Sequence, residues 1–130
     1  MRVLALDHGE ARCGCAVSDP SGTLATPLAV IERPDSRKGL ARIAALAEEL
    51  GAERLVVGLP LTLAGEEGEQ AAAARVFAES LQRRVRVPVD LYDERLTTRM
   101  AAATDARADE DSVAAAHLLD SYLAAQRAGA

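Results

Sequence analysis

Residues 4–20 read LALDHGEARCGCAVSDP and set the pattern of the fold. In and just before this stretch, Arg2 to Leu6 and Cys13 to Val17 are short apolar runs separated by a glycine-containing turn. Apolar runs of this length between turn residues predict strands. Residues 19–22, DPSG, form a second turn signal, so Thr23 to Ile31 predicts a third strand. Strands joined by such short turns indicate an antiparallel meander.

The chain then alternates between helical and strand patterns. Ser36 is suited to cap a helix, and apolar residues recur at helical spacing from there to Gly51, a residue type that commonly stops helices. The other expected elements are strands at 54–59 and 87–92, a helix at 66–85 and a helix after Asp109. The expected buried faces are Ala73, Phe77 and Leu81 in the second helix and Ala115, Leu118, Leu119 and Tyr122 in the third.

Strands connected through helices return parallel and right-handed in one sheet. The element order therefore predicts an α/β fold with a mixed five-stranded sheet, its first three strands antiparallel and the later ones parallel crossovers, flanked by helices. In such sheets the chemistry gathers at strand ends, where side chains from several strands converge.

The composition is that of a globular protein with an aliphatic core. The 130 residues are 49% hydrophobic but 2% aromatic, so Ala, Leu and Val must fill the interior. This length predicts one domain over residues 1–130. No apolar stretch approaches the roughly 20 residues that span a bilayer, and no signal-peptide profile follows Met1, so we expect a cytoplasmic protein with no membrane partner. A net charge of −5 argues against nonspecific coating of nucleic acid and requires a local basic patch for any polyanion.

Cys13 and Cys15 are the two cysteines of the chain, and their spacing puts both on one face of a strand. We interpret them as small strand residues, because the spacing differs from the CxxC arrangement of redox and zinc motifs. The alternative is a zinc site completed by His8 and His117.

Three acidic residues stand where carboxylates are unusual. Asp7 ends the first apolar run, Glu94 follows the strand expected at 87–92, and Asp111 falls on the buried stripe of the last helix. Each has a structural alternative: a turn-initiating Asp7, a solvated turn at Glu94 and a helix cap at Asp111.

Taken together, the three acids predict a metal site. Clustered carboxylates repel one another, so such a cluster is stable mainly around a hard divalent cation, and Mg²⁺ or Mn²⁺ suits oxygen-only ligands. Two such ions, about 4 Å apart, can activate water and stabilise the leaving oxygen in phosphodiester cleavage. The sequence holds no convincing nucleophilic triad, so the hypothesis is metal-dependent hydrolysis.

At these residues the chain resembles the YqgF/RuvX family. The motifs that carry the resemblance are LALDHGEARCGCAVSDP at 4–20, VVGLPL at 56–61 with Gly65 and Gly68 after it, DERLTT at 93–98, and DSVAA at 111–115 leading to Leu118, Leu119 and Tyr122. They follow one another in the family's order over nearly the whole chain. The resemblance implies an RNase H-like fold and a hydrolase of the nuclease type.

Carried over by motif, the resemblance makes Asp7, Glu94 and Asp111 the metal-binding catalytic acids. It also points to Arg12 and Arg95, which could clamp a phosphate bidentately. The remaining candidates for substrate binding, beside Glu94, are Thr98 and Arg99. A salt bridge to the acids is the alternative role of each arginine.

The family is associated with maturation of the 5′ end of precursor 16S ribosomal RNA and with resolution of Holliday junctions. We favour structured RNA over branched DNA, because junction resolution calls for a homodimer with a broad basic surface. Residues 100–110 are Ala-rich and acidic where the family commonly has Lys and Arg. A basic cluster at residues 83–86 could compensate for the missing positive charge.

Two further alternatives stay open. One is a noncatalytic module that binds RNA or a ribosome-assembly partner, because a fold alone does not establish activity. The other is an ATPase, since Asp7-x-Gly9 followed by Gly14 also resembles the phosphate-binding hairpin of actin-like and sugar-kinase proteins. Those proteins close two such lobes around ATP, and 130 residues provide one.

Overall fold

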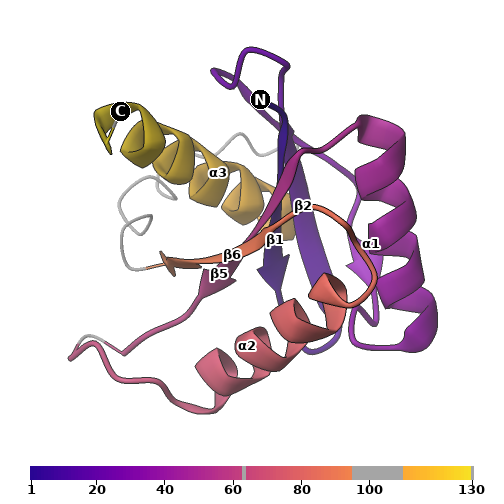
Figure 1. Cartoon of the computed structure of the whole chain (residues 1–130). Helices are drawn as coiled ribbons and strands as arrows, with labels where there is room; N and C mark the ends of the chain where they lie inside the picture. Colours follow the sequence, from indigo (N-terminus) through magenta and orange to yellow (C-terminus); the bar gives the residue numbers. More distant parts are fainter. Residues whose placement is uncertain (63, 95–109, 130) are drawn as a thin grey trace.

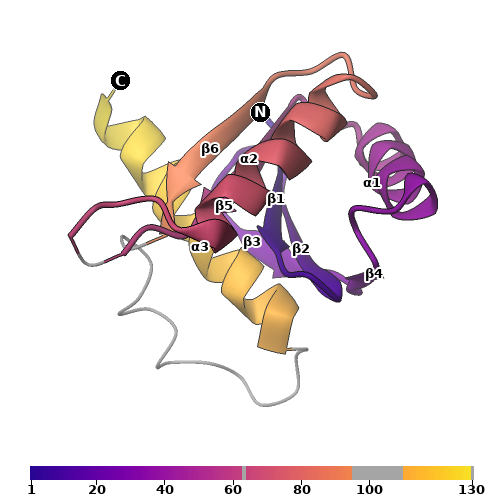
Figure 2. The same cartoon turned by 90° about the horizontal axis from the view of Figure 1, so that it is seen from below.

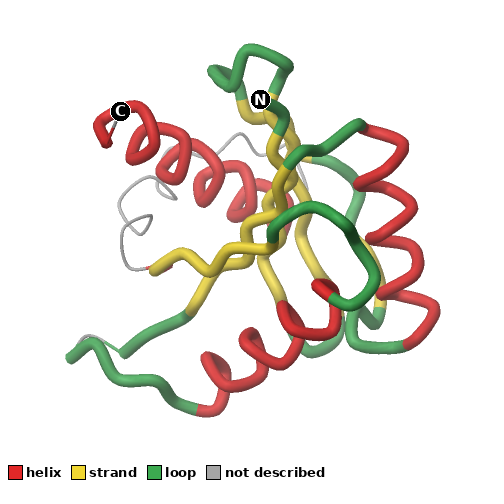
Figure 3. Tube along the Cα trace, in the orientation of Figure 1, coloured by secondary structure: helices red, strands yellow, loops and turns green. Residues whose placement is uncertain are grey.

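The computed structural model describes residues 1–62, 64–94 and 110–129 (Figure 1). The elements in chain order are β1 (Val3–His8), β2 (Arg12–Ser18), β3 (Ala25–Pro27), β4 (Ile31–Glu32), α1 (Arg37–Leu50), β5 (Arg54–Leu59), α2 (Glu69–Gln82), β6 (Val89–Asp93) and α3 (Glu110–Gly129) (Figure 3). The strands form one sheet in the order β3-β2-β1-β5-β6, with β4 beside β2. β1 is antiparallel to β2 and parallel to β5, which confirms the predicted mixed sheet.

The prediction of five strands was wrong by one, because the segment Thr23 to Ile31 is divided into β3 and β4. Pro27 pairs with Ala16 of β2, and Ile31 pairs with Cys13. Between these two pairs, the chain advances four residues from Pro27 to Ile31 but only three residues from Cys13 to Ala16 in β2. The extra residue is a bulge, and it follows a proline that has no N–H to continue the ladder.

The ends of α1 were predicted correctly from the sequence, whereas the bounds of α2 were not. Ser36 accepts a hydrogen bond from a backbone N–H of the first turn of α1 at 2.9 Å, and Gly51 ends that helix with φ 65°, both as predicted. α2 is shorter than predicted, because a loop occupies the residues before its N-cap, Gly68. Its buried stripe includes Ala74, whereas Ala73 is exposed, so the predicted stripe was wrong at that position.

The molecule has three layers. α1 and α2 cover one face of the sheet and α3 covers the other (Figures 1 and 2). Alternate residues of β1 supply the two cores: Leu4 and Leu6 pack beneath α1 and α2, and Val3 and Ala5 pack beneath α3. The predicted face of the third helix, Ala115, Leu118, Leu119 and Tyr122, is buried in that second core.

α3 runs opposite in direction to β1, so its first turn lies toward the carboxyl end of that strand. Near its start, Ser112 Oγ accepts a hydrogen bond from the backbone N–H of Cys15 at 3.4 Å, and Cys15 is paired with Leu6 late in β1. Near its end, Arg127 Nη1 donates to the carbonyl of Gly22 at 3.1 Å, in the turn that borders the start of β1. Across the described ranges, no helix has the length and apolar character needed to cross a membrane.

Candidate active site at the carboxyl end of the sheet

Asp7 stands in the strand at the centre of the sheet and has glycine neighbours in both adjacent strands. Across the antiparallel ladder it is paired with Gly14 of β2. On the other side, the parallel ladder of β1 and β5 pairs Leu6 with Val57, and Gly58 is the next residue of β5. The carboxylate of Asp7 is therefore flanked by positions that carry no side chain.

Asp7 and Gly58 belong to the face of the sheet that α3 covers. Side chains alternate between the two faces of a strand. Ala5, two residues before Asp7, and Val56, two residues before Gly58, both lie in the core beneath α3. The same alternation places Arg12, two residues before Gly14, on this face at the exposed start of β2.

Glu94, the residue directly after edge strand β6, also lies on the face of the sheet that α3 covers, close to Gly58. Tyr92 is paired with Gly58 and packs against the core beneath α3, whereas Leu91 packs against the other core. Alternation therefore directs Asp93, the last residue of β6, away from α3. The Glu94 side chain lies over Gly58: a Cβ placed on that glycine would be 2.7 Å from Glu94 Cγ and 2.8 Å from Cδ.

The two carboxyl groups meet and perturb each other. Burial, the hydrogen bond to Asp7 and the negative charges of Asp7 and Asp93 together raise the pKa of Glu94 to about 8. Two carboxylates in contact cannot both ionise without a cation between them or beside them. The raised pKa therefore favours the protonated form of one carboxyl group of this pair, and that proton is shared in the hydrogen bond between Glu94 and Asp7.

Asp111 lies in the first turn of α3, the turn that faces the carboxyl end of β1. Its neighbour Ser112 is buried and holds this turn on β2 through the contact with Cys15. The side chain of Asp111 lies outside the described residues. The other predicted site residues that lie outside them are Arg95, Thr98 and Arg99.

The alternative zinc set does not come together in the described parts of the chain. Cys13 and Cys15 are free, buried thiols in the core beneath α1 and α2. His117 belongs to α3, on the opposite face of the sheet. A hydrogen bond to Cys15, burial and nearby negative charge raise the pKa of the Cys13 thiol well above its ordinary value, which favours the neutral form. Within residues 1–62, 64–94 and 110–129, no group of three or more His, Cys, Asp and Glu side chains is arranged to hold a metal.

His8 supports the end of β1 in a way that sequence reasoning missed. Its Nε2 is 2.7 Å from Asp35 Oδ2, and its ring stacks on Phe77 with a centroid separation of 4.5 Å. With 6% of its side chain exposed, His8 fixes the strand directly after Asp7. The role of Gly58 was also missed, although a glycine inside a buried strand is a known signal of close approach.

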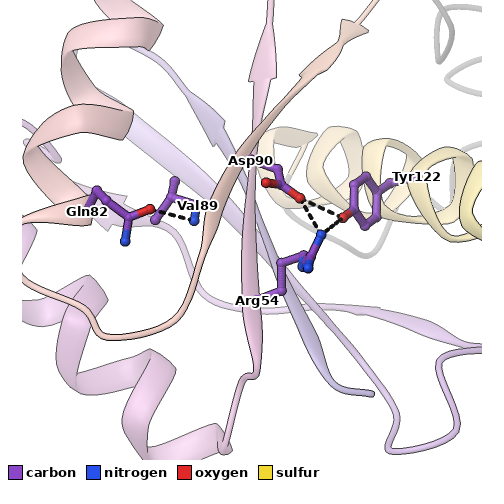
Figure 4. A network of polar contacts seen from close by, with 5 residues as sticks. All are labelled: Arg54, Gln82, Val89, Asp90 and Tyr122. Carbon is purple, nitrogen blue, oxygen red and sulfur yellow. Dashed lines mark hydrogen bonds and ion pairs between the residues drawn. The ribbon is translucent and has the colours of Figure 1, made fainter.

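A polar network fixes α3 at its other end (Figure 4). Arg54 Nη1 donates to Asp90 Oδ2 at 2.7 Å and to Tyr122 Oη at 3.3 Å, and the Tyr122 hydroxyl donates to Asp90 Oδ2 at 3.0 Å. Beside it, Gln82 Oε1 accepts the backbone N–H of Val89 at 2.9 Å, so α2 holds the start of edge strand β6. The network joins β5, which carries Gly58, to α3, which carries Asp111, and to β6, which ends directly before Glu94.

Comparison with known families identifies one match over nearly the full length. The RuvX family, described as Holliday junction resolvase, matches residues 1–125. A protein of Chloroflexus aurantiacus is 40% identical over 134 residues, covering 96% of this chain and 88% of its own length. A protein of Mycobacterium tuberculosis is 47% identical over 132 residues, covering 94% and 78%. Both carry the provisional name pre-16S rRNA nuclease.

Solved structures confirm the predicted RNase H-like fold class. Thermus thermophilus RuvC in complex with a Holliday junction substrate superposes with a TM-score of 0.69 at 17% identity, covering 99% of this chain and 96% of RuvC. Fowlpox virus resolvase in complex with Holliday junction DNA superposes with a TM-score of 0.59 at 9% identity, covering 97% and 99%. At these identities the likeness concerns the arrangement of the elements.

Proposed function

The chain belongs to the RuvX family, and from this premise we propose that it is a metal-dependent nuclease that hydrolyses phosphodiester bonds of precursor 16S ribosomal RNA during processing of its 5′ end. The observation that carries the proposal is the contact between Asp7 of β1 and Glu94, which directly follows β6, because β5 separates these two strands. Buried carboxyl groups that raise each other's pKa are typical of functional sites. The relatives' name supplies the substrate.

The donor set fits Mg²⁺ or Mn²⁺. Asp7 and Glu94 offer only oxygen atoms, which are the ligands that these hard cations prefer. The raised pKa of Glu94 supports the same assignment, because burial, the hydrogen bond to Asp7 and the negative charge of Asp7 all disfavour a second ionised carboxylate here unless a cation neutralises it. We assign Asp111 as the third ligand, since it lies in the turn of α3 that faces the carboxyl end of β1.

In this proposal, some residues of the chain bind the metal and others bind the phosphate groups of the substrate. Bound divalent metal would supply an activated water and charge stabilisation for the leaving oxygen. Asp7, Glu94 and Asp111 would hold and orient it. Arg12, at the exposed turn end of β2 on the same face of the sheet, would bind a phosphate of the substrate. Arg95, Thr98 and Arg99 remain proposed substrate-binding residues on the strength of the DERLTT motif.

Branched DNA is the second candidate substrate. The RuvX family carries the description Holliday junction resolvase, and RuvC has the same fold with a junction bound. Junction resolution needs two active sites, so this candidate goes with a homodimer. The net charge of −5 favours the first candidate, because a four-way junction presents more phosphate to the protein than a single processing site does.

Matched substrates decide between the two. An end-labelled RNA that spans the 5′ processing site of 16S ribosomal RNA and a four-way DNA junction with arms of equal length would be incubated with the protein and Mn²⁺ or Mg²⁺. We expect cleavage of the RNA that is lost in EDTA and in Asp7→Asn. Paired symmetric nicks in the junction with intact RNA would establish the second candidate. Binding of RNA by wild-type protein with no cleavage under any metal would leave only a noncatalytic role.

The domain organisation and the cellular location of the protein follow from the same reasoning. We propose that residues 1–130 form one nuclease domain, because both cores share the single sheet. A ribosomal RNA precursor as substrate places the protein in the cytoplasm. Sedimentation of the protein alone and with RNA would establish whether it acts as a monomer or as a homodimer.

A further inference from the structure

Glu94 can meet Asp7 only by crossing β5, because β5 lies between β6 and β1 in the sheet. Neighbouring strands are about 4.8 Å apart, so two such spacings separate the backbones that carry the two acids. A glutamate side chain bridges this distance only if it lies across the intervening strand. Gly58 stands at the crossing, because it is paired with Tyr92, two residues before Glu94.

A side chain at position 58 would occupy the path of Glu94. The nearest atoms to a Cβ built there are Oε1, Cγ and Cδ of Glu94. All three belong to a side chain and none to the backbone, so β5 and β6 can stay paired while the carboxylate is displaced. The positive φ values among the described glycines are at Gly22, Gly51 and Gly65. Gly58 is thus required by the space that it leaves open, and its backbone conformation suits other residues.

We propose that Gly58 is the positioning residue of the acidic site. Because Gly58 has no side chain, the side chain of Glu94 can lie across β5 and reach Asp7. The inference rests on the proposed function in one respect, namely that Glu94 is a metal ligand. Given that role, Gly58 sets the affinity for the metal without contacting metal or substrate.

The test compares Gly58→Ala with Gly68→Ala, a control in which the added methyl group meets nothing within 4 Å. Mn²⁺ affinity would be measured by calorimetry on the full chain, and the melting temperature would be measured in EDTA. We expect Gly58→Ala to weaken Mn²⁺ binding by about tenfold to a hundredfold, as changes in residues that orient metal ligands do. We expect it to lower the melting temperature by roughly 5 °C through overpacking. The control should leave Mn²⁺ affinity unchanged, and it should lower the melting temperature only by the cost of alanine at the N-cap of α2, which is independent of Glu94.

A double-mutant cycle separates positioning from a general structural role. Glu94→Ala removes the Cγ, Cδ and Oε1 atoms that the new methyl group would meet. In that background, Gly58→Ala should change neither Mn²⁺ affinity nor melting temperature, because there is no side chain left to displace. A glycine needed only for the strand itself would give additive losses in the cycle.

The outcomes distinguish this inference from the proposed function. Wild-type Mn²⁺ affinity in Gly58→Ala would overturn the inference, and so would a loss of melting temperature that persists in the Glu94→Ala background. Absence of Mn²⁺ binding by the wild-type protein would instead refute the metal-dependent function. The melting cycle in EDTA would then still decide whether Glu94 passes over Gly58, since it requires no metal.

Discussion

The hydroxyl group of Tyr122 donates a hydrogen bond to Asp90 Oδ2 at 3.0 Å, and this contact joins the later half of α3 to the start of the edge strand β6. Tyr122 is 3% exposed, and its ring meets Tyr92 edge-on at 5.6 Å. The side chain thus supports α3 through both its ring and its hydroxyl group.

Replacing Tyr122 by Phe removes the hydroxyl group and leaves the ring. Asp90 keeps Arg54 as a partner, so the expected loss in the free energy of unfolding is about 1 kcal/mol. Urea denaturation would measure it. A loss above roughly 3 kcal/mol would contradict this account, because it would mean that the ring packing had changed as well.

Asp7→Asn should separate activity from stability. We expect cleavage to fall by more than about a thousandfold, since a metal ligand is lost. In EDTA at pH 8 we expect the melting temperature to rise by roughly 4 °C, equivalent to about 1 kcal/mol, because the repulsion between the two carboxylates is relieved. Thermal melts of both proteins in EDTA would show it, and a variant less stable than wild type would argue that Asp7 has a stabilising role in the metal-free fold.

The stability of the metal-free protein should fall as pH rises from about 5 to 8. Glu94 has a pKa of about 8 in the folded chain and 4.5 as the ordinary value, so the folded state holds a proton that the unfolded state has lost. The carboxyls with lowered pKa, Asp19 and Glu67, act oppositely, but their effect is confined to pH values below about 4. Melts in EDTA at several pH values would follow the slope, and Glu94→Gln should flatten it.

The same proton makes metal binding depend on pH. Below pH 8 a divalent cation must displace the proton from Glu94, so Mn²⁺ affinity should increase up to about pH 8 and then level off. Calorimetry in two buffers of different ionisation enthalpy would count the released proton. An affinity that is constant from pH 6 to 8 would show that Glu94 is already ionised in the metal-free protein.

His8→Ala should destabilise the fold more than Asp35→Ala. The first change removes the ring that stacks on Phe77 together with the contact to Asp35, and we expect a cost of about 2 kcal/mol. The second removes a half-exposed partner, whose pair with the imidazole is worth less than about 1 kcal/mol. Chemical denaturation of the two variants gives the comparison, and equal losses would mean that the contact with Asp35, and not the stacking on Phe77, supports the end of β1.

The sequence was informative wherever a local signal decides the structure. Ser36 and Gly51 bound α1 as predicted, because a cap and a left-handed stop act within one turn of the helix. Asp7 was placed at the end of the first strand from the run before it, and it is the penultimate residue of β1. The bulge after Pro27 was not predicted, because it depends on the register against β2 and not on the segment itself.

In the acidic site too, features that depend on local sequence were predicted and those that depend on strand pairing were not. Glu94 was preferred over Asp93 only by resemblance to the family, and the position of the Glu94 side chain over Gly58 now gives a physical reason for that preference. Gly58 was noticed as part of a motif, but nothing near it in the sequence indicates that the space it leaves is filled by Glu94. Such a relationship exists only after the two strands pair, so it is beyond any local pattern.

The open space at Gly58 also has a genetic consequence. Every glycine codon becomes an alanine codon by a single base change, and the three heavy atoms nearest to the added methyl group all belong to the side chain of Glu94. By the proposal above, such an allele would encode a protein that still folds but binds its metal more weakly. We expect its defect to be partial and to depend on the supply of divalent metal, so that added Mn²⁺ would restore growth of a strain that carries only this allele.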